Sequence, residues 1–485
     1  MPRPAVMLRP LLQLDSGPAL VDGPGEQAIS AMPQLDVQAL REKAVIDALA
    51  SGDDLAAQRW GLIVPLGTLG DELLRCLAPL LEQRARQQDM ASADLVVLRV
   101  PAGSELTMAA ARAWREECYD TIADWDRPSY LLILGNLHEV PESIHRVFSD
   151  RLVGRLAFSL KGGEPDLAAY RRYAEKVLRW ESQPSPQKKA RARVLVAKDG
   201  SEAIETTMDA LVRPLYALAG IAGKRFPIAE MNPEHAVWVD RRDDLFAHIE
   251  PGPPTVLFSV SHGYGGPRGG WNPAAGADQT QEQGSLCFAS AKDRLQARDV
   301  AAMESFLPGG IWFLLACYGA GTPRDSHYRH WLERLIACEE FAGSATAILR
   351  ALPGVGERPF IAALPQAALA HPEGPLACMG HLDLAWTYSF QDLHTGRERS
   401  RPDAFFGVLR TLARRGRVGL AFSQLLQALQ LANTQLSDLY DTAEATDSPA
   451  PPAQLGHLWM LRQDLAGYVL LGDPAARLPL SPTDA

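Results

Sequence analysis

The chain has 485 residues, of which 47% are hydrophobic and 22% charged, so it has the composition of a globular protein with a sizeable core. Its formal net charge of −10 argues against non-specific nucleic-acid binding, because no excess of basic residues is present to neutralise phosphates. No apolar run is long enough for a transmembrane helix. The short apolar stretch at residues 5–14 is interrupted by Arg9 and Pro10, which makes it a poor signal peptide.

Cysteine usage indicates a protein with free thiols. The six cysteines are scattered and form no CxxC motif; they are Cys76, Cys118, Cys287, Cys317, Cys338 and Cys378. A structural zinc site is therefore not predicted, and no other metal or cofactor is indicated. Unpaired thiols are typical of a reducing compartment, so we expect a cytoplasmic protein.

The first part of the chain reads as an arm followed by alternating strands and helices. Residues 1–36 are rich in Pro and Gly and are expected to form an extended arm. Strands are then predicted at 60–66, 95–100 and 130–134. Helices are predicted at 37–49, 70–87, 106–118 and 165–180. This alternation predicts an α/β fold with a mostly parallel sheet and right-handed crossovers.

A polar stretch with two prolines, residues 183–190, is the best internal boundary. We therefore expect two α/β halves, a non-catalytic one at 37–185 and a catalytic one at 190–485. In the second half, strands are predicted at 193–197, 256–261, 311–316, 376–379 and 468–471. Helices are predicted at 202–218, 328–352 and 421–441, with a proline-rich loop at 448–452.

Two apolar runs of the second half end in reactive side chains. Residues 256–261 lead to His262 and Gly263, and residues 311–316 lead to Cys317. Because the ligand site of such sheets lies past the carboxyl ends of the strands, His262 and Cys317 are predicted to face one crevice. An imidazole beside a thiol lowers the thiol pKa and can protonate a leaving amine, which makes this a candidate nucleophile pair. The backbone amides of Gly263 and Cys317 could form an oxyanion hole.

Simpler interpretations of each motif remain. A cysteine after an apolar run is usually a core residue, and a lone His-Gly is usually a turn, but their joint occurrence favours the pair. Gly319 and Gly321 are expected to allow tight or left-handed turns that expose the thiol of Cys317. Cys378 with His381 is a rival pair. Both of these residues lie on one short segment, however, and Cys378 is expected to point into the sheet.

These stretches resemble a known family. Ser-His-Gly after the first run and Ala-Cys-Tyr-Gly-Ala-Gly-Thr after the second resemble the caspase-like cysteine peptidases of clan CD, most closely the gingipain branch and the related CHAT domains. Residues 130–136, 363–367, 380–390 and 471–475 support the resemblance. It implies a caspase-like mostly parallel sheet with helices on both faces and two α/β half-domains. It also implies Cys317 as nucleophile, His262 as its proton-transfer partner and the amides of Gly263 and Cys317 as oxyanion donors.

The sequence departs from that family in some respects. Gingipains are secreted with long propeptides, whereas this chain shows no signal peptide, no evident pro-segment and no tetratricopeptide array. Three loops, at residues 264–273, 318–326 and 382–390, are expected to converge above the Cys–His pair. They carry the candidate substrate-binding residues Trp271, Asp383 and Trp386. A carboxylate at Asp383 would favour a basic residue at the cleavage site. The alternative is that Asp383 caps a turn and Trp386 is a core residue.

The function indicated is a cysteine endopeptidase that cleaves a protein or peptide substrate through a thioester acyl-enzyme. By analogy with the family, it would act in regulated proteolysis such as bacterial defence or cell death. A catalytically silent scaffold of the same fold is the main alternative, against which the retention of His262 and Cys317 weighs. A different cysteine-dependent acyl transfer is a third possibility. Neither a nucleic-acid partner nor a membrane span is expected.

Overall fold

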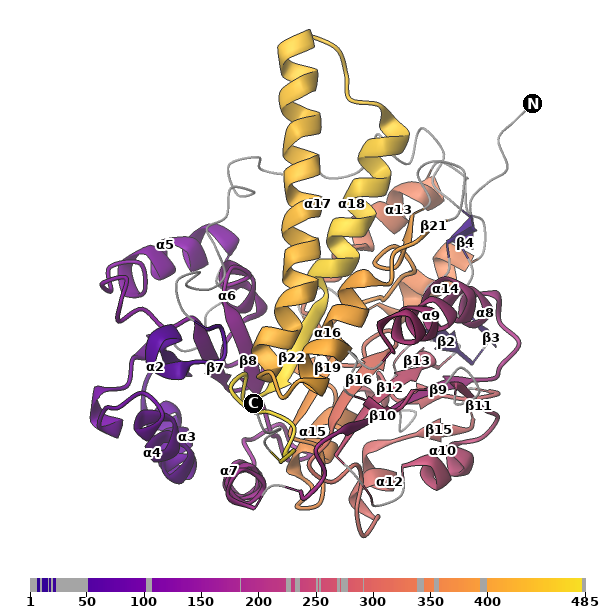
Figure 1. The fold of residues 1–485 in the computed structure, drawn as a ribbon. Coiled ribbons are helices and arrows are strands. Elements are labelled where there is room, and N and C mark those ends of the chain that lie inside the picture. Colours follow the sequence, from indigo (N-terminus) through magenta and orange to yellow (C-terminus); the bar gives the residue numbers. More distant parts are fainter. Residues whose placement is uncertain are drawn as a thin grey trace, which may run out of the picture.

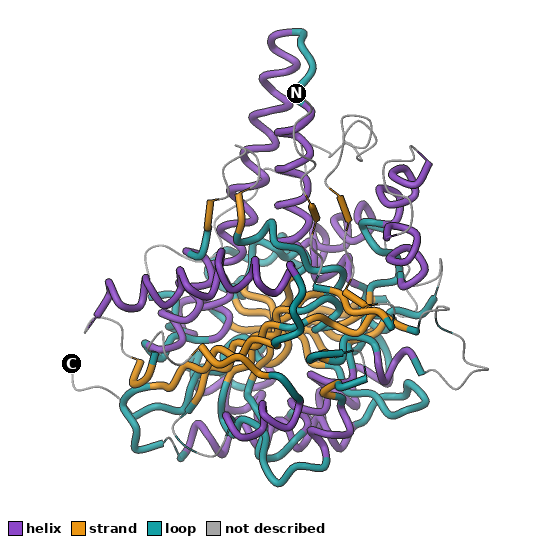
Figure 2. The backbone as a smooth tube through the Cα atoms, turned by 90° about the vertical axis from the view of Figure 1, so that its right-hand side faces the viewer, coloured by secondary structure: helices purple, strands orange, loops and turns teal. Residues whose placement is uncertain are grey.

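The computed structural model describes residues 7–8, 11–15, 17–18, 21–22, 51–101, 107–183, 185–223, 228–231, 236–249, 252, 254–267, 271, 278–290, 292–337, 344–352, 357–392 and 399–481. The helix predicted at residues 37–49 lies outside these ranges. A twisted eleven-stranded sheet runs through the middle of the molecule, with helices above and below it (Figures 1 and 2). The predicted fold class, α/β with a mostly parallel sheet covered on both faces, is confirmed.

The strands of the large sheet follow the order β10-β9-β12-β16-β19-β22-β8-β7-β5-β6, and β11 also pairs with β9. Those of the first half are β5 (Trp60–Pro65), β6 (Val97–Val100), β7 (Tyr130–Leu134) and β8 (Leu152–Leu156). Those of the second half are β9 (Ala190–Ala197), β10 (Ile228–Glu230), β11 (Ala236–Val239), β12 (Thr255–Val260), β16 (Ile311–Leu315), β19 (Ala377–His381) and β22 (Tyr468–Gly472). Both halves therefore share one sheet, and the predicted boundaries near residues 36 and 185 stay predictions.

One antiparallel pairing divides the sheet. Strand β22 runs antiparallel to β19 but parallel to β8, while the other described pairings of this sheet are parallel. The strands of the first half consequently run opposite to strands β9, β12, β16 and β19. Their carboxyl ends open toward the other edge of the sheet, away from the ends of β12 and β16.

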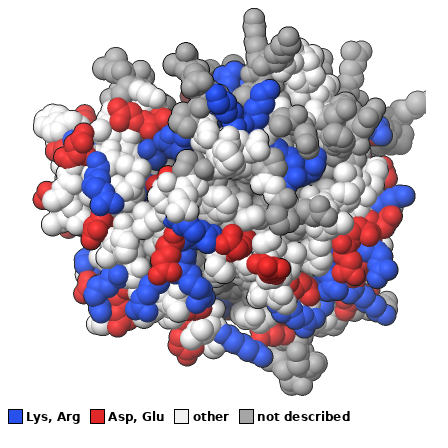
Figure 3. Space-filling model, turned by 60° about the horizontal axis from the view of Figure 1, so that its bottom comes forward, with Lys and Arg blue, Asp and Glu red and all other residues white. Residues whose placement is uncertain are grey.

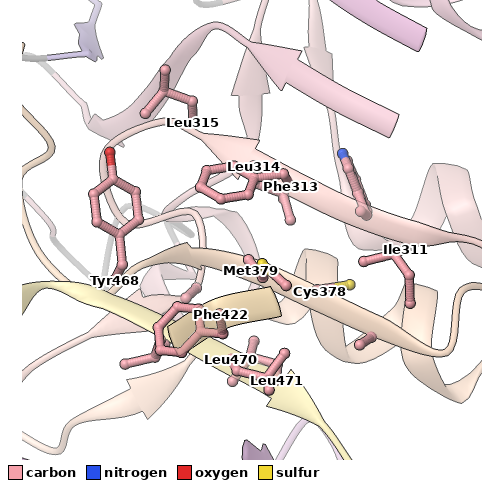
Figure 4. Packing of buried hydrophobic residues seen from close by; sticks show 14 of the residues in the cluster. Ile311, Phe313, Leu314, Leu315, Cys378, Met379, Phe422, Tyr468, Leu470 and Leu471 are labelled. Atoms are coloured by element: carbon pink, nitrogen blue, oxygen red, sulfur yellow. The ribbon is translucent and has the colours of Figure 1, made fainter. Parts of the chain in front are cut away.

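Strands β12 and β16 are adjacent and parallel, with Val256 opposite Ile311 and Val260 opposite Leu315. Both strands are buried along their whole length, as apolar runs in a parallel sheet covered on two sides should be. Figure 4 shows Phe313 of β16, Met379 of β19 and Leu470 of β22 close together around Phe422, within one hydrophobic cluster. The predicted adjacency of the two motif-bearing strands is confirmed.

Helices cover the two faces. One face carries α3 (Thr68–Cys76), α4 (Ala78–Arg86), α7 (Leu167–Ser182), α10 (Arg242–His248), α12 (Ala297–Ala301) and α15 (Ala363–Ala370) (Figure 1). The other carries α5 (Met108–Cys118), α6 (Glu142–Val147), α8 (Glu202–Thr207), α9 (Arg213–Ala222), α13 (Arg329–Ala337), α14 (Ser344–Ala351), α16 (Asp403–Ala413), α17 (Val418–Thr446) and α18 (Pro452–Ala466). Short helices α2 (Leu55–Gln58) and α11 (Gln279–Glu282) complete the set. No helix among the described residues is long and apolar enough to cross a membrane.

Some helix predictions are wrong in detail. The single helix expected at residues 70–87 is two helices that meet at Leu77, because Pro79 fits only in the first turn of a new helix. Helix α17 is longer than predicted, and α18, which directly follows the proline-rich loop, was not predicted. These two helices form a hairpin that projects from the molecule (Figure 1).

On the face seen in Figure 3, acidic and basic side chains are interspersed.

The described part of the N-terminal arm pairs with the second half. Strand β2 (Leu12–Leu14) lies parallel to β13 (His262–Gly266) in a small sheet of order β15-β14-β13-β2-β3. Its other strands are β3 (Gly17–Pro18), β14 (Leu286–Cys287) and β15 (Arg294–Leu295), and a separate pair joins β1 (Met7–Leu8) to β4 (Val21–Asp22). Two further pairs are β17 (Gly321–Thr322) with β18 (Phe360–Ile361) and β20 (Gln391–Asp392) with β21 (Arg399–Ser400). The arm thus contributes a strand directly beside His262.

Candidate active site

Three neighbouring parallel strands end at one place. Asp199 lies two residues beyond β9, His262 two residues beyond β12, and Cys317 two residues beyond β16. The strands pair in the order β9-β12-β16, so their carboxyl ends lie side by side. The three side chains are therefore brought to the same edge of the sheet.

The imidazole of His262 is fully buried and is held through Nε2. This atom lies 2.9 Å from Oγ of Ser201 and 3.2 Å from Oδ2 of Asp199, whose other oxygen accepts the Ser201 N–H at 2.9 Å. An ionised carboxylate can only accept a hydrogen, so this environment favours a proton on Nε2. Nδ1 makes no well-formed hydrogen bond to any described residue, which leaves its lone pair available to take a proton.

Cys317 sits on a tight turn after β16. Its sulfur accepts the Ala385 N–H at 3.2 Å and lies 3.5 Å from the Ala385 carbonyl. The left-handed residue of this turn is Tyr318, with φ of 56°, and not Gly319 or Gly321 as expected. Gly321 is required instead by a close approach, since a Cβ there would lie 2.6 Å from the carbonyl oxygen of Phe360.

Gly263 packs against the backbone of Cys317. A Cβ on Gly263 would lie 1.8 Å from the Cys317 carbonyl oxygen, so no other residue fits without moving the backbone. The amides of these two residues point at one acceptor: the carbonyl oxygen of Leu11 accepts the Gly263 N–H at 2.7 Å and the Cys317 N–H at 3.0 Å. The N–H of Leu11 donates to the Ala385 carbonyl at 3.0 Å. A peptide carbonyl thus occupies the hollow between the two amides.

Burial keeps both candidate catalytic groups neutral in this arrangement. It lowers the pKa of His262 to about 4, although the Asp199 charge and the nearby Leu11 carbonyl act in the opposite direction. Burial also raises the pKa of the Cys317 thiol well above its usual value, with the Ala385 amide opposing this shift. The thiolate is consequently disfavoured while Leu11 fills the space beside it.

The third loop, residues 382–390, is stabilised by hydrogen bonds to the side chain of Asp383. The carboxylate of Asp383 accepts Ser326 Oγ at 2.9 Å, the His327 N–H at 3.0 Å and the Leu384 N–H at 2.8 Å. These partners favour the interpretation that Asp383 supports a turn. Trp386 is fully buried and packs in an aromatic cluster against Tyr328, with ring centroids 5.4 Å apart. The residue of this loop that contacts Leu11 through its backbone is Ala385.

Helix α18 supplies the support for this loop. The carboxylate of Asp464 accepts the Trp386 N–H at 2.9 Å and the Ser389 N–H at 2.8 Å. Nε2 of His381 lies 2.9 Å from the carbonyl oxygen of Asp464 and 3.5 Å from its carboxylate. Burial opposes the charged imidazole, but the Asp464 hydrogen bond and charge raise the pKa of His381. His381 is therefore engaged in this brace.

The remaining candidates lie apart from the Leu11 carbonyl. Trp271 is half-buried beside β13, where Nε1 donates to the Gly265 carbonyl at 3.2 Å and the ring packs edge-on against Tyr264 at 5.8 Å. The Tyr264 hydroxyl donates to Asp15 of the arm at 3.3 Å. Cys378 lies in the packed core with Met379 (Figure 4), and burial raises its thiol pKa. This placement fits the expectation that Cys378 points into the sheet.

Two parts of the site were not predicted from the sequence. Asp199 and Ser201 follow β9 in the stretch Lys-Asp-Gly-Ser, and that pattern of a strand ending in an acidic residue and glycine was the available signal. Leu11 lies in a stretch with no recognisable pattern, and no local signal identifies its place. Among the described residues, no cluster of His, Cys, Asp or Glu is arranged to hold a metal ion.

Comparison with known proteins finds distant likeness in structure but none in sequence. No protein-family model matches the sequence, and no curated protein matches it. Among solved structures, one described as "Structure of Protease" is similar over 86% of this chain and 78% of that chain, with 12% sequence identity and a TM-score of 0.47. A likeness of this degree carries no argument about activity, so a function has to rest on the geometry of the site.

Proposed function

We propose that the chain is a cysteine endopeptidase with Cys317 as nucleophile and His262 as its proton-transfer partner. The observation that carries the proposal is the peptide carbonyl of Leu11 held by the amides of Gly263 and Cys317, at 2.7 and 3.0 Å. Two backbone amides converging on one carbonyl oxygen are what an oxyanion hole requires. One of them belongs to the residue that would attack.

The proposed mechanism assigns one step to each of these groups. Nδ1 of His262 takes the thiol proton of Cys317, and the sulfur attacks the carbonyl carbon held between the two amides. The negative charge on the oxygen is stabilised by both N–H groups. His262 returns the proton to the leaving amine, and water then hydrolyses the thioester. Asp199 holds the imidazole from the far side and stabilises its charged form, so we assign it a positioning role.

The other candidates have supporting roles in this proposal. Asp383 and Trp386 form the base of the loop that presents Ala385, and Trp271 borders the strand β13 along which a peptide would lie. A role in bacterial defence or regulated cell death rests on the resemblance of the sequence motifs alone.

The test is labelling by peptides that carry a thiol-reactive electrophile. We expect one equivalent of label on Cys317 in the wild type and none in Cys317→Ala, with Cys378→Ala as the matched control because Cys378 is also fully buried. The silent scaffold would instead be supported if no peptide electrophile labels Cys317 in either the folded wild type or a folded Leu11→Asp variant, in which the arm no longer blocks the site.

A further inference from the structure

The described segment of the arm contacts the site as a bound peptide would. Leu11 donates its N–H to Ala385 and gives its carbonyl to Gly263 and Cys317, so both of its backbone polar groups are taken up by the candidate active site. Each partner comes from a different loop, following β19, β12 and β16 respectively. This is the full set of backbone contacts expected of the residue on the acyl side of a cleaved bond.

The chain beyond Leu11 is held as well. Leu12 lies opposite Gly263, Gln13 opposite Tyr264 and Leu14 opposite Gly266, in a parallel pairing with β13. Addition of a strand to a sheet edge is a common way to bind an extended peptide, because main-chain hydrogen bonds supply the affinity. Both sides of the Leu11–Leu12 bond are thus anchored.

The side chain of Leu11 defines what the site accepts. It is 0% exposed and belongs to the main hydrophobic cluster, as does Leu12. A lysine or arginine in its place would bury a charge, and the carboxylate of Asp383 is already occupied by Ser326 and two backbone amides. The enclosure therefore suits an aliphatic side chain.

We propose that residues 11–14 occupy the active site as its own peptide substrate, that Leu11–Leu12 is the first bond it cuts, and that the site selects a leucine-sized aliphatic residue on the acyl side. The inference rests on the proposed function. Sulfur of Cys317 bonds to the Leu11 carbonyl carbon, the bond to the Leu12 nitrogen breaks, and His262 passes the thiol proton to that nitrogen. Water then cleaves the thioester, leaving a carboxylate on Leu11, a new N-terminus at Leu12 and a free thiol.

Occupation by the arm has a second effect. While the uncut arm fills the site, other peptides are excluded from Cys317 and His262, both of which are 0% exposed. Cutting the bond frees Leu11 from its covalent link to the strand β2 that pairs with β13. Release of the cut segment then opens the site to substrates from outside.

The test follows the full-length chain over time by intact-mass measurement and N-terminal sequencing. We expect the wild type to acquire an N-terminus at Leu12 and Cys317→Ala to stay uncut. Leu11→Met should be cut at a rate within about threefold of wild type, and Leu11→Asp at least about 100-fold more slowly. The matched control Leu160→Asp, at a leucine that is 53% exposed, should be cut like the wild type.

Two further measurements keep the outcomes distinct. The arm of Leu11→Asp binds less tightly than the native arm. Folded Leu11→Asp should therefore be labelled on Cys317 at least about tenfold faster than Cys378→Ala protein whose Leu11–Leu12 bond is still intact. The self-cut enzyme should cleave peptides with leucine on the acyl side at least about 100-fold faster than those with arginine. A wild type that labels on Cys317 yet keeps the Leu11–Leu12 bond, or that prefers arginine, overturns this inference and leaves the proposed function standing. If neither wild type nor Leu11→Asp is cut or labelled, the proposed function fails with it.

Discussion

Asp199→Asn probes the positioning of the imidazole with little change of shape. The substitution removes the negative charge 3.2 Å from Nε2 of His262, and the remaining amide oxygen can still accept the Ser201 N–H. With an effective dielectric constant of about 20, unit charges at this separation attract by about 5 kcal/mol. Asp199 Oδ2 makes no well-formed hydrogen bond among the described residues, so the contact is electrostatic, and desolvation offsets part of this attraction. A loss of about 2–3 kcal/mol in the transition state lowers the rate about 30- to 150-fold.

The assay is the second-order rate of labelling by a leucyl peptide electrophile, measured between about pH 3 and pH 9. Asp199 favours the charged imidazole, so its removal lowers the pKa of His262 further. The acid limb of the profile, below which His262 is protonated and cannot accept the Cys317 proton, should therefore move to lower pH. Asp209→Asn is the matched control, because that carboxylate is 62% exposed and pairs with Arg213 at the surface.

Equal labelling rates for Asp199→Asn and wild type, with superimposable pH profiles, would refute the positioning role. Unchanged rates with intact thermal unfolding would mean that Ser201 alone orients the ring. A loss of the folded state in Asp199→Asn is separated from a catalytic effect by circular dichroism, which should match that of the Asp209→Asn control.

Three other predictions follow from the same contacts. Cys317→Ala should abolish peptide labelling, whereas Cys378→Ala should keep it; each should lose about 1 kcal/mol of unfolding free energy in denaturant titration, since both thiols are fully buried. Gly263→Ala should slow labelling about 100- to 1000-fold with native circular dichroism, because its Cβ would lie 1.8 Å from the Cys317 oxygen and displace an oxyanion donor; a wild-type rate would contradict that role. Asp464→Asn should lower the unfolding free energy by about 3 kcal/mol at pH 6 in denaturant titration, because it removes the charged partner of His381. Because the pKa of His381 is raised, its contribution is present below its usual pKa and is lost as pH rises through the folded value, so wild-type stability should decline there and the variant's should not.

The sequence was sufficient for the parts of the site that depend on local pattern. The runs that became β12 and β16 are largely apolar, are buried along their whole length and lead to His262 and Cys317, so burial in a parallel sheet determined both their pairing and the direction of their ends. The residue types at the strand ends then indicated the chemistry. Asp199 had the same kind of signal after β9, but a single acidic residue before a glycine is common at strand ends and was not singled out.

Other parts depend on contacts between distant segments. The helix expected at residues 70–87 is divided because Pro79 starts a new helix, a choice that packing against α7 helps to make. Tertiary packing determines that β22 lies between β19 and β8. It also determines that Leu11 lies between three loops. No periodicity within those short segments encodes their partners. Gly319 and Gly321 were expected to allow tight or left-handed turns, yet the left-handed residue of the turn is Tyr318, whose N–H donates to the Asp383 carbonyl at 2.9 Å.

The central place of β22 also bears on how the protein can be synthesised. Until residues 468–472 leave the ribosome, β8 and β19 each present an unpaired edge in the middle of the future sheet. Asp464, which braces the loop that presents Ala385, emerges only a few residues earlier. A nascent chain therefore carries both His262 and Cys317 long before it can assemble the loop that completes their surroundings. Full competence should arise in one step, only after residues 464–472 have been translated, and chains that lack them should depend on chaperones to keep those two edges apart.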